Sequence, residues 1–92
     1  MAQNKNIPIN VFLGNQITLD LLEIGKSGII KTVGGGGALR RRLLDMGLTP
    51  KTKVSVRKAA PMGDPIEITL RGYELTIRKE DAKEITVEKI DS

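Results

Sequence analysis

The stretch that most constrains the fold is Ile66–Arg78, with the sequence IEITLRGYELTIR. Apolar and polar residues alternate on both sides of Arg71–Gly72, which is the pattern of two β-strands joined by a tight turn. With this dipeptide as the loop, six apolar side chains share one face of the hairpin: Ile66, Ile68, Leu70, Tyr73, Leu75 and Ile77. A register slip of one residue would turn one strand's apolar set to water. Because a lone hairpin is marginally stable, the rest of the chain must cover this face.

Three other segments have the pattern of short strands. Gly28–Val33 is rich in β-branched residues, Lys53–Ala60 places Val54 and Val56 inward, and Ile85–Lys89 has the same alternation. A polar helical turn, Lys79–Glu84, precedes the last strand. The predicted fold class is therefore mainly β (α+β), a small, strongly bent five-stranded barrel with one helix inserted between its first and second strands.

That helix is predicted over Ala38–Met46 and ended by Gly47. Its apolar stripe has helical spacing and consists of Leu39, Leu43, Leu44 and Met46. Three consecutive arginines project away from this stripe, and we expect Asp45 to pair with Arg41 or Arg42.

The N-terminal part of the chain divides near residue 17. Ile17–Gly25 is predicted as a short helix, with Thr18 as its N-cap and Gly25 as its end, that plugs one end of the barrel. Residues 1–16 are predicted to be an N-terminal extension, either an extended arm on the barrel or a flexible end, and residues 17–92 the barrel domain.

Two loops raise functional questions. Four glycines, Gly34–Gly37, precede the helix, where free N–H groups favour anions. The Lys and the Ser or Thr of a phosphate-binding loop are absent, so we interpret the four glycines as a connection between strand and helix. Pro61–Pro65 is strongly constrained, and the Asp64 carboxylate is expected to accept hydrogen bonds from nearby backbone N–H groups.

Composition argues against several classes of function. Ninety-two residues allow one small domain. The sequence contains neither Cys nor His, so we nominate no catalytic residue, no metal ligand and no cofactor, and we do not expect an enzyme. No apolar run is long enough for a signal peptide or a membrane span, which predicts a cytoplasmic location.

Charge is unevenly distributed around a net value of +4. Between residues 38 and 58 there are seven basic residues and one acidic residue, Asp45, whereas residues 79–92 carry three lysines and five acids. The basic stretch is either a solvated face or a contact for an acidic partner. Our candidate contact surface consists of Arg40, Arg41, Lys51 and Lys53, with Met62 on an adjacent loop as an apolar contact.

Five motifs, in register, resemble the ferrous iron transport protein A (FeoA) family. They are RLLDMGL at 42–48, APMGDP at 60–65, LRGYELTIR at 70–78, the TL-x-x-L-x-x-G pattern at 18–25, and A-x-x-I-x-V at 82–87. The resemblance implies an SH3-like barrel and a cytoplasmic accessory protein of bacterial ferrous iron uptake. Its implied partner is the GTP-binding domain of the FeoB membrane transporter, so that it meets the membrane only through the transporter.

The chain departs from the family pattern at Lys51, which stands where the family usually has Gly after Pro50 and which predicts a type I turn. The alternative function is a small basic barrel that binds nucleic acid. Only Phe12 and Tyr73 are available for base stacking, so we expect no stable nucleic-acid complex. A relative of the barrel found in metal-dependent repressors is a third possibility, which would need an upstream DNA-binding domain.

Overall fold

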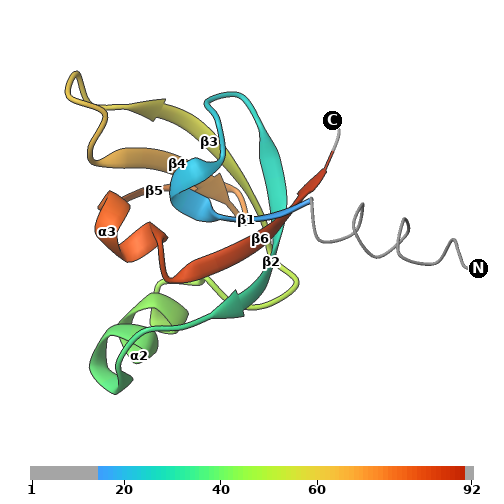
Figure 1. The fold of residues 1–92 in the computed structure, drawn as a ribbon, viewed down its shortest axis with the longest axis vertical. Helices are drawn as coiled ribbons and strands as arrows, with labels where there is room; N and C mark the ends of the chain where they lie inside the picture. Colours follow the sequence, from blue (N-terminus) through green and yellow to red (C-terminus); the bar gives the residue numbers. More distant parts are fainter. Residues whose placement is uncertain (1–14, 91–92) are drawn as a thin grey trace, which may run out of the picture.

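Figure 1 shows the computed structural model of the protein, which describes residues 15–90. The expectations for residues 1–14 lie outside the described part. The elements, in chain order, are β1 (Gln16–Thr18), η1 (Leu19–Leu21), β2 (Ser27–Val33), α2 (Gly37–Asp45), β3 (Lys53–Ala59), β4 (Ile66–Leu70), β5 (Tyr73–Ile77), α3 (Lys79–Ala82) and β6 (Ile85–Ile90). The predicted strands and the predicted central helix are all present, with ends that differ by one or two residues.

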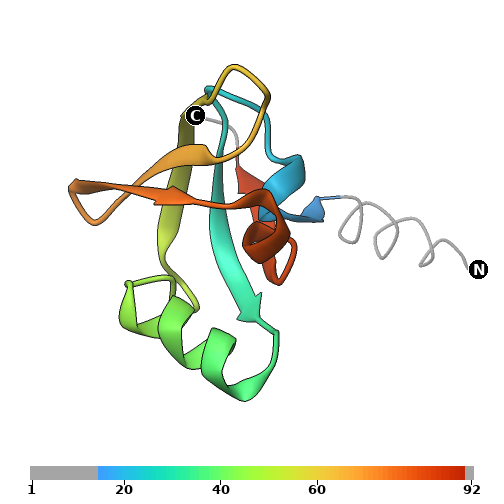
Figure 2. The same cartoon turned by 90° about the vertical axis from the view of Figure 1, so that its left-hand side faces the viewer.

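The six strands form one antiparallel sheet in the order β1-β6-β2-β3-β4-β5. The last strand, β6, therefore lies between the first two strands of the described chain. The sheet bends strongly, with α2 at one end of the molecule and the β3–β4 loop at the other, as both views show (Figures 1 and 2). Register shifts in the β2–β6 and β3–β4 pairings mark the irregular points of the sheet.

The hairpin predicted from Ile66–Arg78 is confirmed in register. Leu70 pairs with Tyr73, and the pairing continues regularly to Ile66 and Ile77. Both loop residues have positive φ, 50° at Arg71 and 84° at Gly72, which is the type I′ geometry whose twist suits a two-residue hairpin. Turn and alternation thus specify the same pairing.

The core fills the concave side of the sheet. It comprises Leu19, Leu22, Ile30, Val33, Leu43, Leu48, Val54, Val56, Ile66, Ile68, Leu70, Ile77, Ala82, Ile85 and Val87. Burial of these side chains is the main stabilising contribution, at about 1.5–3 kcal/mol for each large one. Burial declines along β5, where Ile77 is buried, Leu75 is half-buried and Tyr73 is exposed.

The predicted helix over Ile17–Gly25 is wrong. Ile17 lies in β1 opposite Val87 of β6, and only Leu19–Leu21 forms a single 3₁₀ turn. Thr18 has the extended conformation of a cap residue but caps no backbone N–H with its side chain. Because β-branched Ile17 and Thr18 fit a strand well, pairing with β6 prevails over a helix too short to be stable by itself. Within residues 15–90 the sheet consequently has six strands and not the predicted five.

The end of α2 is built as predicted. Gly47 has φ 100°, and the N–H of Leu48 donates to the carbonyl of Leu43 at 3.1 Å, as in a glycine-terminated helix. The Tyr73 hydroxyl donates to the Met46 carbonyl and faces the α-carbon of Gly47, where a Cβ would meet it. Glycine is therefore required at position 47 both for its conformation and for its size.

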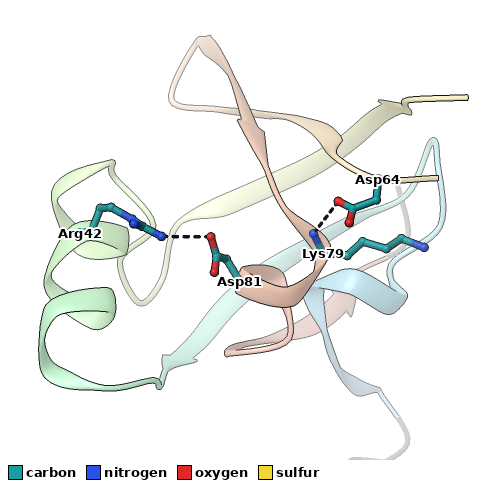
Figure 3. Close-up of polar contacts among 4 residues, drawn as sticks. All are labelled: Arg42, Asp64, Lys79 and Asp81. Carbon is teal, nitrogen blue, oxygen red and sulfur yellow. Dashed lines mark hydrogen bonds and ion pairs between the residues drawn. The ribbon is translucent and has the colours of Figure 1, made fainter. Parts of the chain in front are cut away.

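The short helix α3 is held from both sides (Figure 3). The Asp64 carboxylate, in the β3–β4 loop, accepts a hydrogen bond of 2.9 Å from the backbone N–H of Lys79, which confirms its expected capping role. Arg42 of α2 pairs with Asp81 at 3.1 Å. The predicted pairing of Asp45 with Arg41 or Arg42 is therefore wrong. Arg42 reaches across to α3, and neither Asp45 nor Arg41 takes part in the ion pairs of residues 15–90.

The turn after α2 also differs from the prediction. Lys51 has φ 75°, and the N–H of Thr52 donates to the carbonyl of Thr49 at 3.2 Å. Pro50 followed by a residue with positive φ is the geometry of a type II turn and not of type I. The backbone N–H of Lys51 donates to Ile30 of β2 at 2.7 Å, and this contact fixes the turn against the sheet.

Candidate functional site

Four of the predicted contact residues lie at the end of the molecule that carries α2. Arg40 and Arg41 belong to α2, Lys51 lies in the turn that follows, and Lys53 is the first residue of β3. All four side chains are exposed. We call this set the basic end.

The charges of the basic end are not neutralised within the described chain. The ion pairs of residues 15–90 involve Lys31, Arg42, Arg57 and Lys58, and none of the four residues of the basic end. Arg40 donates from Nε to the carbonyl of Val33 at 3.0 Å, which fixes the side chain against β2 while leaving its positive charge uncompensated. This arrangement suits contact with an acidic surface.

Met62 does not adjoin the basic end, contrary to the prediction. It lies in the loop after β3, whereas Lys53 begins that strand. A seven-residue strand separates the two ends by about 20 Å, at roughly 3.3 Å per residue. Figure 2 shows α2 and the β3–β4 loop at opposite ends of the fold. Met62 is 92% exposed and so forms a separate apolar point on the surface.

A hollow of about 360 Å³ lies beside this loop. Ala59, Ala60, Pro61 and Pro65 contribute apolar lining, and the 3.6 Å ion pair of Lys58 with Glu67 also borders it. The hollow was not predicted from the sequence. The signal that the sequence offers is the pair of prolines that line the hollow, each of which fixes its own φ.

The contacts of Arg71 are a second feature that was not predicted from the sequence. Its guanidinium donates to the hydroxyls of Thr49 and Thr52, both at 2.9 Å, so the hairpin tip is fixed to the turn that carries Lys51. The sequence predicts only the place of Arg71 in the hairpin loop. A cation that bonds two hydroxyls from another segment leaves no local sequence signal.

The described residues show neither a metal-binding cluster nor a membrane-spanning helix. Within residues 15–90, no three His, Cys, Asp or Glu side chains gather closely enough to hold a metal ion. None of the helices described there has the length and apolar character that crossing a bilayer requires. What the arrangement offers is a group of exposed positive charges at one end of the barrel, with the Arg40 side chain held against β2, which suits binding.

Comparison with known proteins identifies relatives over most of the chain. Residues 17–89 match the model of a family described as the FeoA domain. The chain is 36% identical over 74 residues to an Fe(2+) transport protein A/Fe(2+) transporter FeoB fusion protein of Porphyromonas gingivalis. The match covers 80% of this chain and 9% of that relative, so the chain corresponds to a small part of the fusion protein.

Two solved structures confirm the fold. A FeoA-like protein of Clostridium acetobutylicum superposes with a TM-score of 0.78 and 37% identity, covering 85% of this chain and 91% of that one. A FeoA of Stenotrophomonas maltophilia, described as a prokaryotic SH3 domain protein, gives a TM-score of 0.70 and 24% identity, covering 78% and 89%. The predicted SH3-like barrel is thus confirmed.

Proposed function

We propose that this chain, which belongs to the FeoA family, is an accessory protein of ferrous iron uptake that acts by binding the cytoplasmic GTP-binding domain of a FeoB-type transporter. The relative in which an FeoA and an FeoB are one polypeptide supports the partnership, because fusion keeps the two at high effective concentration. In this proposal the protein works on the cytoplasmic side, catalyses nothing itself and meets the membrane only through the transporter.

The observation that carries the proposal is the uncompensated charge of the basic end. Arg40 is held in place by the Val33 carbonyl, and Lys51 and Lys53 lie on a turn and a strand that backbone hydrogen bonds fix to β2. Exposed cations attract an acidic partner over distances of about a Debye length and orient it on encounter. The basic end is therefore the proposed contact surface for the transporter domain.

The test compares two double charge reversals. Arg40→Glu/Arg41→Glu removes two cations of the basic end, whereas Lys26→Glu/Lys89→Glu makes the same change in net charge at the other end of β2, where Gly28 pairs with Lys89. We expect the first variant to bind the isolated GTP-binding domain roughly tenfold more weakly, since two exposed pairs contribute about 0.5–1 kcal/mol each. The control variant should bind like the parent chain.

Binding is measured by NMR titration of labelled protein, with GDP and with a GTP analogue bound to the transporter domain. Equal weakening by both variants would show that net charge matters and the basic end does not. A titration without shifts for the transporter domain, together with salt-dependent shifts on adding single-stranded nucleic acid, would favour the alternative function of a nucleic-acid-binding barrel.

A further inference from the structure

Within residues 15–90, the sheet ends in β5, a strand whose outer edge is open. Among the described residues, β5 pairs with β4 alone. Since Leu70 and Tyr73 flank a two-residue turn, they form a hydrogen-bonded pair, and every second residue of β5 repeats this pattern. The N–H and C=O groups of Glu74 and Thr76 consequently point away from β4. No backbone hydrogen bond of these four groups is found within residues 15–90.

The concave side of β5 is also incompletely covered. Tyr73 and Leu75 belong to the inner face of the hairpin together with buried Ile68 and Leu70 of β4. Yet Tyr73 is 42% exposed and Leu75 only half-buried, because no further strand of the described chain lies on that side. An open edge beside partly exposed apolar side chains is a template for adding a strand.

We propose that the strand added there is β5 of a second copy of this chain, antiparallel and centred on Leu75. In that register Glu74 of each copy lies opposite Thr76 of the other. The four outward backbone groups of one edge then meet the four of the other, giving four backbone hydrogen bonds around a twofold axis. The contact is self-complementary because the same short segment supplies both sides.

Side chains favour the same register. On the outer face no two glutamates are opposed, and Arg78 comes diagonally opposite Glu74 of the second copy, within reach of long side chains. On the inner face the two Leu75 side chains meet, and Tyr73 lies opposite Ile77 of the second copy. A register centred on Glu74 would instead oppose the two carboxylates and lose the pairing of Thr76 with Glu74.

The contact involves about five residues on each copy, far fewer than the roughly 20–30 of a standard stable interface. The net charge of +4 also opposes association. We therefore expect a weak dimer that forms at high protein concentration. The inference is independent of the proposed function, since the basic end lies on other elements.

Disulfide trapping tests both the contact and its register, because the chain has no cysteine of its own. In the proposed dimer the two residues at position 75 form a non-hydrogen-bonded pair with Cα atoms about 4.5 Å apart, which a disulfide can bridge. Positions 76 are about 8 Å apart by the strand spacings. We expect Leu75→Cys to form a covalent dimer under mild oxidation, and the more exposed Thr76→Cys to form at least tenfold less.

A second pair of variants tests the unmodified edge. Thr76→Pro removes an outward N–H that makes no bond to β4, so the fold should be kept, whereas Thr76→Val keeps the N–H. Sedimentation at up to about 1 mM protein should show a concentration-dependent dimer for the parent and Thr76→Val chains, and monomer only for Thr76→Pro. A monomeric parent chain, or equal crosslinking at positions 75 and 76, would overturn the proposal.

Discussion

Two cationic residues of this barrel hold positive φ angles, Lys51 at 75° and Arg71 at 50°. A side chain in the left-handed region costs roughly 1–2 kcal/mol relative to the right-handed one. The two positions are linked, because the Arg71 guanidinium bonds the hydroxyls of Thr49 and Thr52, which flank Pro50–Lys51. Tertiary hydrogen bonds thus hold both residues in conformations that their own backbone preferences oppose.

Replacing Lys51 by glycine should relieve part of this cost. We expect Lys51→Gly to raise the free energy of unfolding by about 0.5–1 kcal/mol, as measured by urea denaturation. Lys51→Ala removes the same charge but keeps a Cβ, so it should leave stability within roughly 0.5 kcal/mol of the parent. Equal stabilisation by both variants would assign the effect to charge and not to the backbone.

At the scale of elements, α3 is too short to be stable alone and depends on its neighbours. Asp64→Ala removes the acceptor of the Lys79 N–H, and we expect a loss of about 1 kcal/mol, as for the loss of an N-terminal cap. Asp64→Asn keeps a carbonyl oxygen and should retain most of this stability. Arg42→Ala, which breaks an exposed ion pair, should cost less than about 0.5 kcal/mol.

Urea denaturation gives these differences, and hydrogen exchange of the Lys79 amide localises them. Protection of that amide should fall in Asp64→Ala and persist in Arg42→Ala. A larger stability loss from Arg42→Ala than from Asp64→Ala would contradict this account and make the ion pair the main support of α3.

Elements with strong local signals were predictable from the sequence. The hairpin had alternation and a turn dipeptide that agree, and α2 had an apolar stripe ended by Gly47. The segment at Ile17–Gly25 was not predictable, since its conformation depends on β6, which lies about 70 residues later along the chain. The partner of Arg42 could not be predicted for the same reason. Helical spacing favours Asp45, whereas the observed partner is Asp81, which is distant in sequence.

At the scale of the whole molecule, charge and apolar surface are separated. The basic end lies at α2, while Met62 and the hollow lie at the β3–β4 loop. The sequence predicts Met62 beside the basic residues, because Met62 and Lys53 are both near β3 in the chain. They lie beyond opposite ends of that seven-residue strand, however, and are therefore far apart. The four basic residues could be grouped from the sequence because α2 and the following turn are consecutive in it.

This separation predicts how binding responds to salt. If the basic end contacts the transporter domain, the dissociation constant should rise severalfold between about 50 and 300 mM salt, because exposed charges are screened. The melting temperature should change little over the same range, since the core is apolar. Calorimetric titration at several salt concentrations gives the dissociation constants, and thermal unfolding followed by circular dichroism gives the melting temperatures. Binding that is insensitive to salt would point instead to Met62 and the hollow.

The place of β6 between β1 and β2 has a consequence for biosynthesis. While the chain emerges from the ribosome, the hairpin and α2 can form from local contacts, but β1 has no strand to pair with until β6 has been made. Pairings so distant in sequence are slow to form and leave apolar strand surface exposed meanwhile. A nascent chain stalled before Ile85 should therefore be a protease-sensitive and aggregation-prone species, and the completed barrel should appear only after the final strand is released from the exit tunnel.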